Sequence, residues 1–315
     1  MYAIGVDIGG MSMKCGLVNE KGEVLDTVIV PTILGDPYQK SINDLNEGIK
    51  KLIAQNNLTV NEVNGIGIGV PGAINNKKGT VDSSANLKWY NVPLRDLVQQ
   101  GVGRQVRITN DANAAALGEA RFGFKWKYPN VIMLTLGTGV GGGIIADGKL
   151  YEGNEGKGAE LGHITLVLNG LPCGCGRKGC AEQYASATAL MRQTREAMEK
   201  DKDSLLWKLC DGDITKVNGK MPFDACKQGD KTAMEVVDNY VMYLSETILN
   251  YSNIFRPNAF ILSGGVAKQG DYLINRIKEY CEKQHWGYEN TPAPSIEVAA
   301  LGYESGIIGA ASLYL

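Results

Sequence analysis

Residues 2–18 read YAIGVDIGGMSMKCGLV, an apolar run followed by an Asp-Ile-Gly-Gly turn and a second apolar run. The runs at 1–6 and 15–18 are short enough for β-strands, and the adjacent glycines favour a tight turn between them. A turn at 20–23 then leads into a third apolar run at 24–30. The pattern predicts an antiparallel meander of strand, glycine turn, strand, turn and strand.

The same pattern recurs in the middle of the chain. Apolar runs at 130–136 and 144–146 flank the glycine-rich stretch 137–143, and an Asp-Gly hairpin turn follows. A glycine turn between two antiparallel strands is therefore present twice. Because 315 residues exceed one ordinary hydrophobic core, we expect two domains.

The rest of the chain is predicted to form helices and short strands joined by loops. The clearest helical spacing of apolar residues lies at 188–200 and 231–255. Residues 80–100 are expected to be loop-rich. Further helices are expected at 38–57, 112–122, 271–283 and 304–315, and further strands at 63–70, 105–109, 260–262 and 295–299.

The composition argues against several classes of protein. The 32 basic and 34 acidic residues nearly balance, so we expect neither nucleic acid nor an anionic membrane as a main partner. No stretch approaches the roughly 20 apolar residues of a membrane span, and the N-terminus lacks the pattern of a signal peptide. Cys15, Cys210, Cys226 and Cys281 are scattered singly, as thiols in a reducing compartment are. We therefore expect a cytoplasmic protein.

The other three of the seven cysteines lie within eight residues, at Cys173, Cys175 and Cys180, and His163 lies ten residues upstream. Zinc prefers four nitrogen and sulfur ligands in a tetrahedron, and this set supplies them. The alternatives are a glycine-rich turn with unbonded thiols, or a disulfide that leaves one thiol over. A structural zinc site is the better interpretation because it also uses the histidine. The second histidine, His285, is expected at a solvated helix end without a function.

Two acids flank this stretch. Glu160 lies three residues before His163, and Glu182 lies two residues after the last cysteine of the cluster. If the metal binds one ring nitrogen of His163, the other can hydrogen-bond a ligand. Two carboxylates and an imidazole N–H are the groups that a polyhydroxylated ligand requires.

The stretch Gly137-x-Gly139-x-x-Gly142 matches the dinucleotide-binding pattern literally, but a strand follows it where that pattern needs a helix. The sequence has no G-x-x-x-x-G-K-[S/T] phosphate loop either. Backbone N–H groups of the two glycine turns can bind phosphate oxygens from two sides, and Asp7 can hold a magnesium ion through water. Plain hairpin turns are the alternative. The repetition, with an acid beside the first turn, favours nucleotide binding.

Asp111 ends a predicted strand and opens a predicted helix. One interpretation is a helix N-cap, the ordinary role of Asn and Asp at a helix start. The other is a general base, which takes the proton of a substrate hydroxyl as its oxygen attacks a γ-phosphate in line. Asn110 or Asn113 would then orient it.

Together these motifs resemble the ROK family (repressors, uncharacterised open reading frames and sugar kinases). The resemblance covers essentially the whole chain and is most specific in the cysteine cluster with Glu160 and His163. It rests on Asp7-Ile-Gly-Gly10, Pro71-Gly72, Asn86-Leu87, Asn110-Asp111-Ala112-Asn113, Leu136-Gly137-Thr138-Gly139, Glu160-x-Gly162-His163, Cys173, Cys175, Cys180, Glu182 and Ser263-Gly264-Gly265.

The resemblance implies an α/β, two-domain actin-like ATPase (ribonuclease H-like) fold, with a duplicated mixed-sheet domain and a cleft between the domains. The small N-terminal domain would take residues 1–117 and the returning C-terminal helix at 303–315. The large domain would take residues 118–302 and carry the zinc-binding loop. A homodimer is usual for this family.

The implied activity is that of an ATP-dependent hexose 6-phosphotransferase, with glucose as the expected substrate and ATP, Mg²⁺ and a structural Zn²⁺ as cofactors. Asp111 would be the catalytic base. Asn86, Asn110, Asp111, Glu160, His163 and Glu182 would bind the sugar, and Asp7, Gly9, Gly10, Ser12, Lys14, Gly137, Thr138, Gly139, Gly264 and Gly265 would bind the nucleotide. Fructose, mannose, allose, N-acetylmannosamine or a β-glucoside stay open as substrates, and polyphosphate as donor. A non-catalytic sugar-sensing protein is the alternative from another class.

One departure from the family pattern affects these expectations. The first phosphate turn usually reads Gly-Gly-Thr, and here Met11 replaces the threonine. A hydroxyl donor is lost unless Ser12 supplies it, so we expect a weaker phosphate contact. Family members that repress transcription carry a helix-turn-helix ahead of the Asp-Gly-Gly strand. Because that strand begins at Met1, we expect no such segment here.

Overall fold

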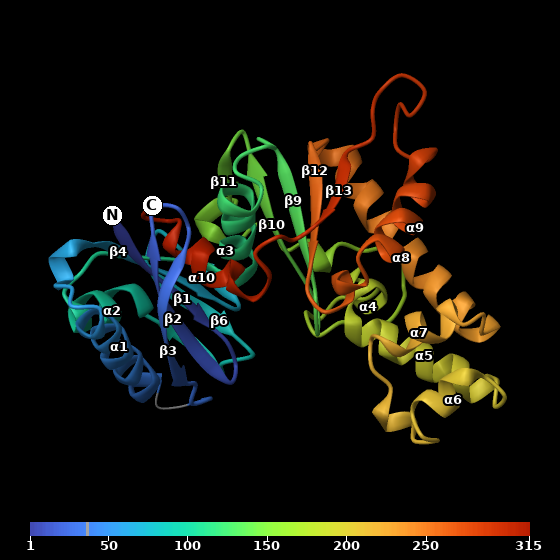
Figure 1. Cartoon of the computed structure of the whole chain (residues 1–315), viewed down its shortest axis with the longest axis horizontal. Helices are drawn as coiled ribbons and strands as arrows, with labels where there is room; N and C mark the ends of the chain where they lie inside the picture. Colours follow the sequence, from blue (N-terminus) through green and yellow to red (C-terminus); the bar gives the residue numbers. More distant parts are fainter. Residues whose placement is uncertain (36–37) are drawn as a thin grey trace. The chain divides into compact units, whose positions relative to one another are not determined.

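The computed structural model describes residues 1–35 and 38–315 (Figure 1). By their internal contacts they form two compact units. The first takes Met1–Val131, Gly143–Ala159 and Ala300–Leu315, and the second takes Ile132–Gly142 and Glu160–Ala299. Contacts thus assign Gly143–Ala159 to the first unit, whereas the sequence-based boundary assigned them to the large domain. That domain boundary stays a prediction.

The sheet of the first unit begins with the predicted meander. β1 (Tyr2–Ile8), β2 (Ser12–Asn19) and β3 (Val24–Pro31) pair antiparallel, which confirms that expectation. β4 (Val63–Val70) and β8 (Val106–Asn110) add in parallel, giving the order β3-β2-β1-β4-β8. The sheet is mixed, and its parallel strands end at a common edge.

Helices cover both faces of this sheet (Figure 1). α1 (Tyr38–Gln55) and α2 (Leu94–Val102) share one apolar core with it. α3 (Asp111–Gly118) and α10 (Ser305–Ala311) pack on the other side. Glycine is required at Gly5 of β1, because a Cβ there would collide with a carbonyl oxygen of α10. The close approach fixes α10, and with it α3, against the strands.

A small sheet lies where the sequence predicted loops. β5 (Ala73–Asn75), β6 (Thr80–Ser84) and β7 (Trp89–Val92) form it in that order, and α2 follows. The prediction of a loop-rich segment at 80–100 is therefore wrong. These strands are short and reach the core through single side chains such as Trp89, which is 1% exposed. They leave no periodic pattern in the sequence.

The second sheet has the order β11-β10-β9-β12-β13 and is also mixed, since β10 and β11 pair antiparallel and β12 and β13 pair parallel. β10 begins at Val140, so the expectation of a glycine turn reaching to Gly143 is wrong. Glycine in this strand serves packing instead, because a Cβ on Gly142 would collide with Leu161. The strands are β9 (Val131–Leu136), β10 (Val140–Ala146), β11 (Lys149–Tyr151), β12 (Ala259–Ser263) and β13 (Ser295–Val298).

The second unit carries most of the helices. α8 (Lys231–Phe255) has the bounds predicted for it and begins at Asp230, whose side chain accepts a hydrogen bond from the Ala233 N–H at 2.7 Å. None of the described helices is long and apolar enough to span a membrane. The other α-helices of the second unit are α4 (Glu182–Ala185), α5 (Ala187–Lys200), α6 (Leu205–Leu209), α7 (Met221–Lys227) and α9 (Asp271–Glu282).

Short helices of other types occur in both units. The 3₁₀ helices lie at Val60–Glu62, Asn154–Gly156, Leu161–His163, Ile214–Lys216, Val266–Gln269 and Gly302–Glu304, and a π-helix lies at Glu119–Gly123.

Candidate active site

The predicted zinc ligands come together in the second unit. One ligand atom from each of His163, Cys173, Cys175 and Cys180 lies within 4.8 Å of the others. The Sγ atoms of Cys175 and Cys180 are 3.6 Å apart, and Cys173 Sγ lies 3.6 Å from His163 Nδ1. A tetrahedral zinc ion holds sulfur and nitrogen ligands about 3.6–3.8 Å apart. The four residues therefore fit a structural zinc ion.

Backbone hydrogen bonds and two glycines shape this loop. The Cys173 N–H donates to the Arg177 carbonyl at 2.8 Å, and the Arg177 guanidinium donates to the His163 carbonyl at 3.1 Å. Gly176 (φ +89°) and Gly179 (φ +74°) are left-handed, a conformation that other residues adopt only at a cost. These contacts bring His163 beside the thiols.

Glu182 connects the cysteine loop to the second glycine turn. It opens α4, and its Oε2 accepts a hydrogen bond from the Val140 N–H at 3.1 Å. The Cys173 thiol lies 3.7 Å from its Oε1. A Cβ on Gly139 would collide with the same carboxylate. The sequence did not predict the contact with Val140, because pairing across 42 residues leaves no local signal.

Glu160 precedes the 3₁₀ turn that carries His163. Desolvation raises the pKa of Glu160, the charge of His163 lowers it, and the charge of Glu182 raises it. The Tyr251 hydroxyl of α8 donates to the Leu161 carbonyl and fixes this turn from the helix side. The predicted sugar-binding residues of the second unit thus form one cluster, supported by α8.

The predicted nucleotide-binding residues of this unit lie at the ends of β9 and β12. The Gly137 N–H donates to the Gly139 carbonyl at 3.1 Å and closes the turn, with Thr138 exposed at its tip. Gly264 (φ +92°) follows β12 with Gly265, and a Cβ on Gly264 would collide with the Leu136 carbonyl. The two glycine segments therefore lie side by side.

In the first unit, Asn110 and Asp111 stand where β8 ends and α3 begins. The Asn110 side chain accepts hydrogen bonds from the N–H groups of Ala112 at 2.9 Å and Asn113 at 3.3 Å, so Asn110 is the N-cap. The interpretation of Asp111 as the cap is therefore wrong. Asp111 occupies the first helical position, half-buried, and its Oδ1 lies 2.9 Å from the Ala112 N–H.

Two more motif residues lie in this unit. Asn110 Nδ2 lies 3.4 Å from the carbonyl of Gly72, which follows β4 with φ +117°. Asn86 is exposed in the turn between β6 and β7. The small sheet that sequence reasoning missed is therefore the element that presents Asn86.

A threonine supports the first glycine turn. The Gly9 N–H donates to the Ser12 carbonyl at 2.9 Å. The Thr32 hydroxyl donates to the Gly9 carbonyl at 2.7 Å, and the Thr32 N–H donates to the Met11 carbonyl at 3.1 Å. Met11 itself is 90% exposed, so its side chain contributes no packing to the turn. Thr32, which lies after β3, was not predicted because no motif in the sequence includes it.

Asp7 stands beside this turn, opposite Lys14 in the β1–β2 ladder. Burial raises the pKa of Asp7, and the charge of Lys14 lowers it. Gly306 of α10 leaves the carboxylate room, because a Cβ there would lie 3.0 Å from Asp7 Cγ. Gly10 has open space around it, as a turn that receives a ligand requires.

The sequence matches a known protein family over nearly its whole length. The ROK family matches residues 3–315. The chain belongs to the ROK family. Its predicted fold class, α/β with two mixed sheets on the actin-like plan, is confirmed by solved ROK kinases that match over the whole chain.

Three ROK relatives show the range of the similarity. The glucokinase of Thermotoga maritima is 39% identical over 319 residues, covering 98% of this chain and 96% of the relative. The N-acetyl-D-glucosamine kinase of Haemophilus influenzae is 31% identical over 323 residues, covering 99% of this chain and 98% of the relative. The crystal structure of a Streptomyces griseus ROK glucokinase in complex with glucose and AMPPNP matches with a TM-score of 0.83 at 37% identity. The match covers 100% of this chain and 99% of the glucokinase chain.

Proposed function

We propose that this chain is an ATP-dependent glucokinase that transfers the γ-phosphoryl group of ATP to the 6-hydroxyl of glucose. The observation that carries this proposal is the whole-chain similarity to the S. griseus glucokinase, whose structure contains glucose and an ATP analogue. The T. maritima glucokinase, at 39% identity, supports the same substrate.

Asp111 is the proposed catalytic base. Asn110 is the N-cap of α3, and Asp111 follows it at the first helical position. Asp111 takes the proton of the 6-hydroxyl while that oxygen forms the new bond to the γ-phosphorus. The bond from phosphorus to the bridging oxygen of the β-phosphate breaks, and ADP leaves.

The remaining site residues have proposed binding roles. The residues proposed to bind sugar hydroxyls are Asn86, Asn110, Glu160, His163 and Glu182. Mg²⁺, when bound with ATP, neutralises phosphate charge. Zinc stabilises the loop that carries His163. The nucleotide residues are Asp7, Gly9, Gly10, Ser12, Lys14, Gly137, Thr138, Gly139, Gly264 and Gly265.

A coupled assay of ADP release with MgATP, across a panel of hexoses and amino sugars, tests the proposal. We expect the highest kcat/KM with glucose. Preference for another sugar would keep the mechanism and replace the substrate. Absence of turnover, with sugar binding still measurable by calorimetry, would contradict the kinase and favour a sugar sensor.

N-acetyl-D-glucosamine is the second candidate substrate, because a kinase of that name is 31% identical over nearly the whole chain. The same panel separates it from glucose. A homodimer is also proposed, from the family resemblance, and light scattering of the purified protein measures the number of chains. A cytoplasmic location is proposed from the singly scattered cysteines, which suit a reducing compartment.

A further inference from the structure

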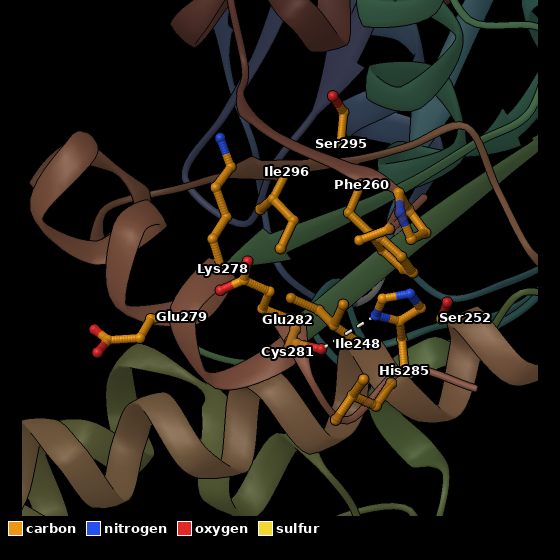
Figure 2. Close-up of a pocket in the computed structure, with 13 residues that line it drawn as sticks. Ile248, Ser252, Phe260, Lys278, Glu279, Cys281, Glu282, His285, Ser295 and Ile296 are labelled. Atoms are coloured by element: carbon orange, nitrogen blue, oxygen red, sulfur yellow. Dashed lines mark hydrogen bonds between the residues drawn. The ribbon is translucent and has the colours of Figure 1, made fainter. Parts of the chain in front are cut away.

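A cavity of about 480 Å³ lies in the second unit between α8, α9, β12 and β13 (Figure 2). Phe260 and Ile296 line it but are buried, and the Ser252 hydroxyl is buried as well. Figure 2 shows the Glu279 carboxylate directed away from the other lining residues. The Ser252 hydroxyl and this carboxylate therefore do not converge on a common point, and the cavity offers a ligand no built site.

His285 also lines this cavity. It is 4% exposed, so the expectation of a solvated helix end is wrong. Its Nδ1 lies 3.4 Å from the Cys281 carbonyl oxygen, and its Nε2 lies 3.2 Å from the Thr291 carbonyl oxygen. The ring thus joins the end of α9 to the segment that returns to β13.

Thr32 holds the first glycine turn by two hydrogen bonds. Its hydroxyl donates to the Gly9 carbonyl at 2.7 Å, and its backbone N–H donates to the Met11 carbonyl at 3.1 Å. The two acceptors stand on either side of Gly10, so one residue holds the turn at both ends. No role in the proposed activity has been given to Thr32 so far.

The bond to Gly9 determines the direction of the Gly10 N–H. The Gly9 carbonyl and the Gly10 N–H belong to one planar trans peptide group, in which C=O and N–H point in opposite directions. Because the carbonyl is turned toward the Thr32 hydroxyl, the Gly10 N–H is directed away from Thr32. Gly10 is exposed, and no heavy atom of the described residues lies within 4 Å of the position that a Cβ would take. A backbone N–H in such a place can donate to a phosphate oxygen.

This peptide group has little else to hold it. Gly9 and Gly10 flank it, and glycine permits backbone rotations that other residues resist. The Met11 side chain adds no packing to the turn, since it is almost fully exposed. A turn that must first be ordered loses part of its binding free energy to that ordering. The Thr32 hydroxyl therefore preorganises the turn.

The segment that carries Thr32 is anchored independently of its hydroxyl. Ser41 of α1 is buried, and its hydroxyl donates to the Ile33 carbonyl at 3.0 Å and accepts from the Ile33 N–H at 3.1 Å. Two residues further on, the Gly35 N–H donates to the Leu87 carbonyl at 3.0 Å. Removal of the Thr32 hydroxyl alone should therefore leave residues 32–35 in place.

We propose that Thr32 is a positioning residue for the nucleotide, whose hydroxyl orients the Gly10 N–H toward a phosphate oxygen. It acts through the peptide group between Gly9 and Gly10. The inference rests on the proposed function, in which the first glycine turn binds the phosphates of ATP.

Titration calorimetry of the full-length protein with MgAMPPNP, without sugar, tests the proposal and needs no turnover. Thr32→Val keeps the shape of the side chain and removes the hydroxyl, so we expect binding weakened about three- to tenfold. Thr32→Ser keeps a hydroxyl and should restore the affinity. Thr27→Val, at an exposed threonine of β3, is the matched control and should leave it unchanged.

Steady-state kinetics separate positioning from a general loss of structure. In Thr32→Val the KM for ATP should rise by the same factor as the dissociation constant of MgAMPPNP. The kcat and the KM for glucose should change little, because the lost contact acts on bound nucleotide before the reaction. A variant with a damaged fold would change all three.

Circular dichroism melts establish that each variant is folded before its affinity is compared, and Thr32→Ala takes the place of Thr32→Val if the valine variant does not fold. The proposal is overturned if loss of the hydroxyl leaves MgAMPPNP binding as tight as in wild type. It is overturned equally if Thr27→Val weakens binding as much, or if Thr32→Ser restores nothing. Wild-type protein that binds no MgAMPPNP would contradict the proposed kinase together with this role, so the two failures are distinguishable.

Discussion

Asp111 stands at the first helical position of α3 because Asn110 satisfies the N–H groups of that helix. Asp111→Asn keeps the shape of the side chain and removes the proposed base. We expect turnover to fall by about 10²–10⁴-fold with glucose affinity little changed. The coupled assay and calorimetry measure the two quantities. Asp44→Asn, which breaks an exposed ion pair to Lys40 on α1, is the control and should change neither.

An Asp111→Asn protein that keeps most of its rate would show that another group takes the proton. The sequence placed Asp111 correctly at a strand-to-helix junction, but it could not assign the cap. Neighbouring Asn and Asp have similar capping preferences, and only the hydrogen bonds from Ala112 and Asn113 distinguish them.

Glu119 supports a pH prediction. It is fully buried in the π-helix, and its carboxylate accepts hydrogen bonds from the N–H groups of Ala300 and Leu301, each at 2.9 Å. Burial raises the pKa of Glu119, and the two hydrogen bonds lower it in part. The folded protein therefore binds this proton more tightly than the unfolded chain, whose glutamates have a pKa of about 4.3. Between the two pKa values the stability falls as pH rises.

Glu119→Gln removes this titration. We expect the free energy of unfolding of wild type, relative to the variant, to fall from about pH 4 upward and to level off above the folded-state pKa. Urea unfolding at a series of pH values measures it. Glu47→Gln, at an exposed helix position paired with Lys50, should show no such fall. A wild-type advantage that grows with pH would contradict the assignment.

At the scale of elements, the zinc loop combines the four proposed ligands with backbone hydrogen bonds such as that from the Cys173 N–H to the Arg177 carbonyl. Cys175→Ser removes one ligand, so we expect zinc to fall from one per chain to nearly none and glucose affinity to fall with it, since His163 loses its anchor. Elemental analysis and calorimetry measure these. Cys210→Ala, a buried cysteine outside the cluster, should keep its zinc. Zinc-free wild-type protein that binds glucose normally would refute the site.

The packing of α10 on α3 gives a second element-scale prediction. A Cβ on Gly309 would collide with the Ala114 carbonyl, so Gly309→Ala forces the helices apart. We expect a loss of about 1–3 kcal/mol in the free energy of unfolding. Turnover should fall as well, because α3 begins at Asp111. Gly219→Ala, where nothing lies within 4 Å, is the control and should change neither quantity. An equally stable Gly309→Ala would show that the contact relaxes without cost.

Elements with strong local signals were predictable, and those stabilised by distant contacts were not. The bounds of helix α8 were predicted correctly because its apolar face repeats along all 25 residues of the helix. The helix begins after the N-cap Asp230 and ends before Arg256, which has a left-handed conformation. Strands β6 and β7 were missed because their burial depends on a few side chains. The start of β10 was misplaced because glycine normally indicates a turn, whereas Gly142 gives room to Leu161.

For the whole molecule, the actin-like class was predicted from the resemblance to the ROK family, which rests on motifs from Asp7 to Gly265 and is most specific in the cysteine cluster. The sequence could not predict the Glu182 contact with Val140 or the cavity beneath α9, because both depend on how separated segments pack. Nor does it rank the sugars, which differ by the position of single hydroxyls. That ranking needs a property of the folded protein.

Ligand-linked stability is such a property. A sugar that binds only the folded protein raises its free energy of unfolding by RT ln(1 + [L]/Kd), about 2.7 kcal/mol at one hundred times Kd. We expect glucose to raise Tm most among the hexoses and amino sugars at equal concentration, in the same order as kcat/KM. Asp111→Asn should keep most of the shift, because the amide can still hydrogen-bond the sugar although it cannot act as a base. Thermal melts of both proteins across the panel measure it. A sugar that raises Tm strongly yet releases no ADP from wild type would identify a sensor, whereas a shift lost with Asp111→Asn would make Asp111 a binding residue.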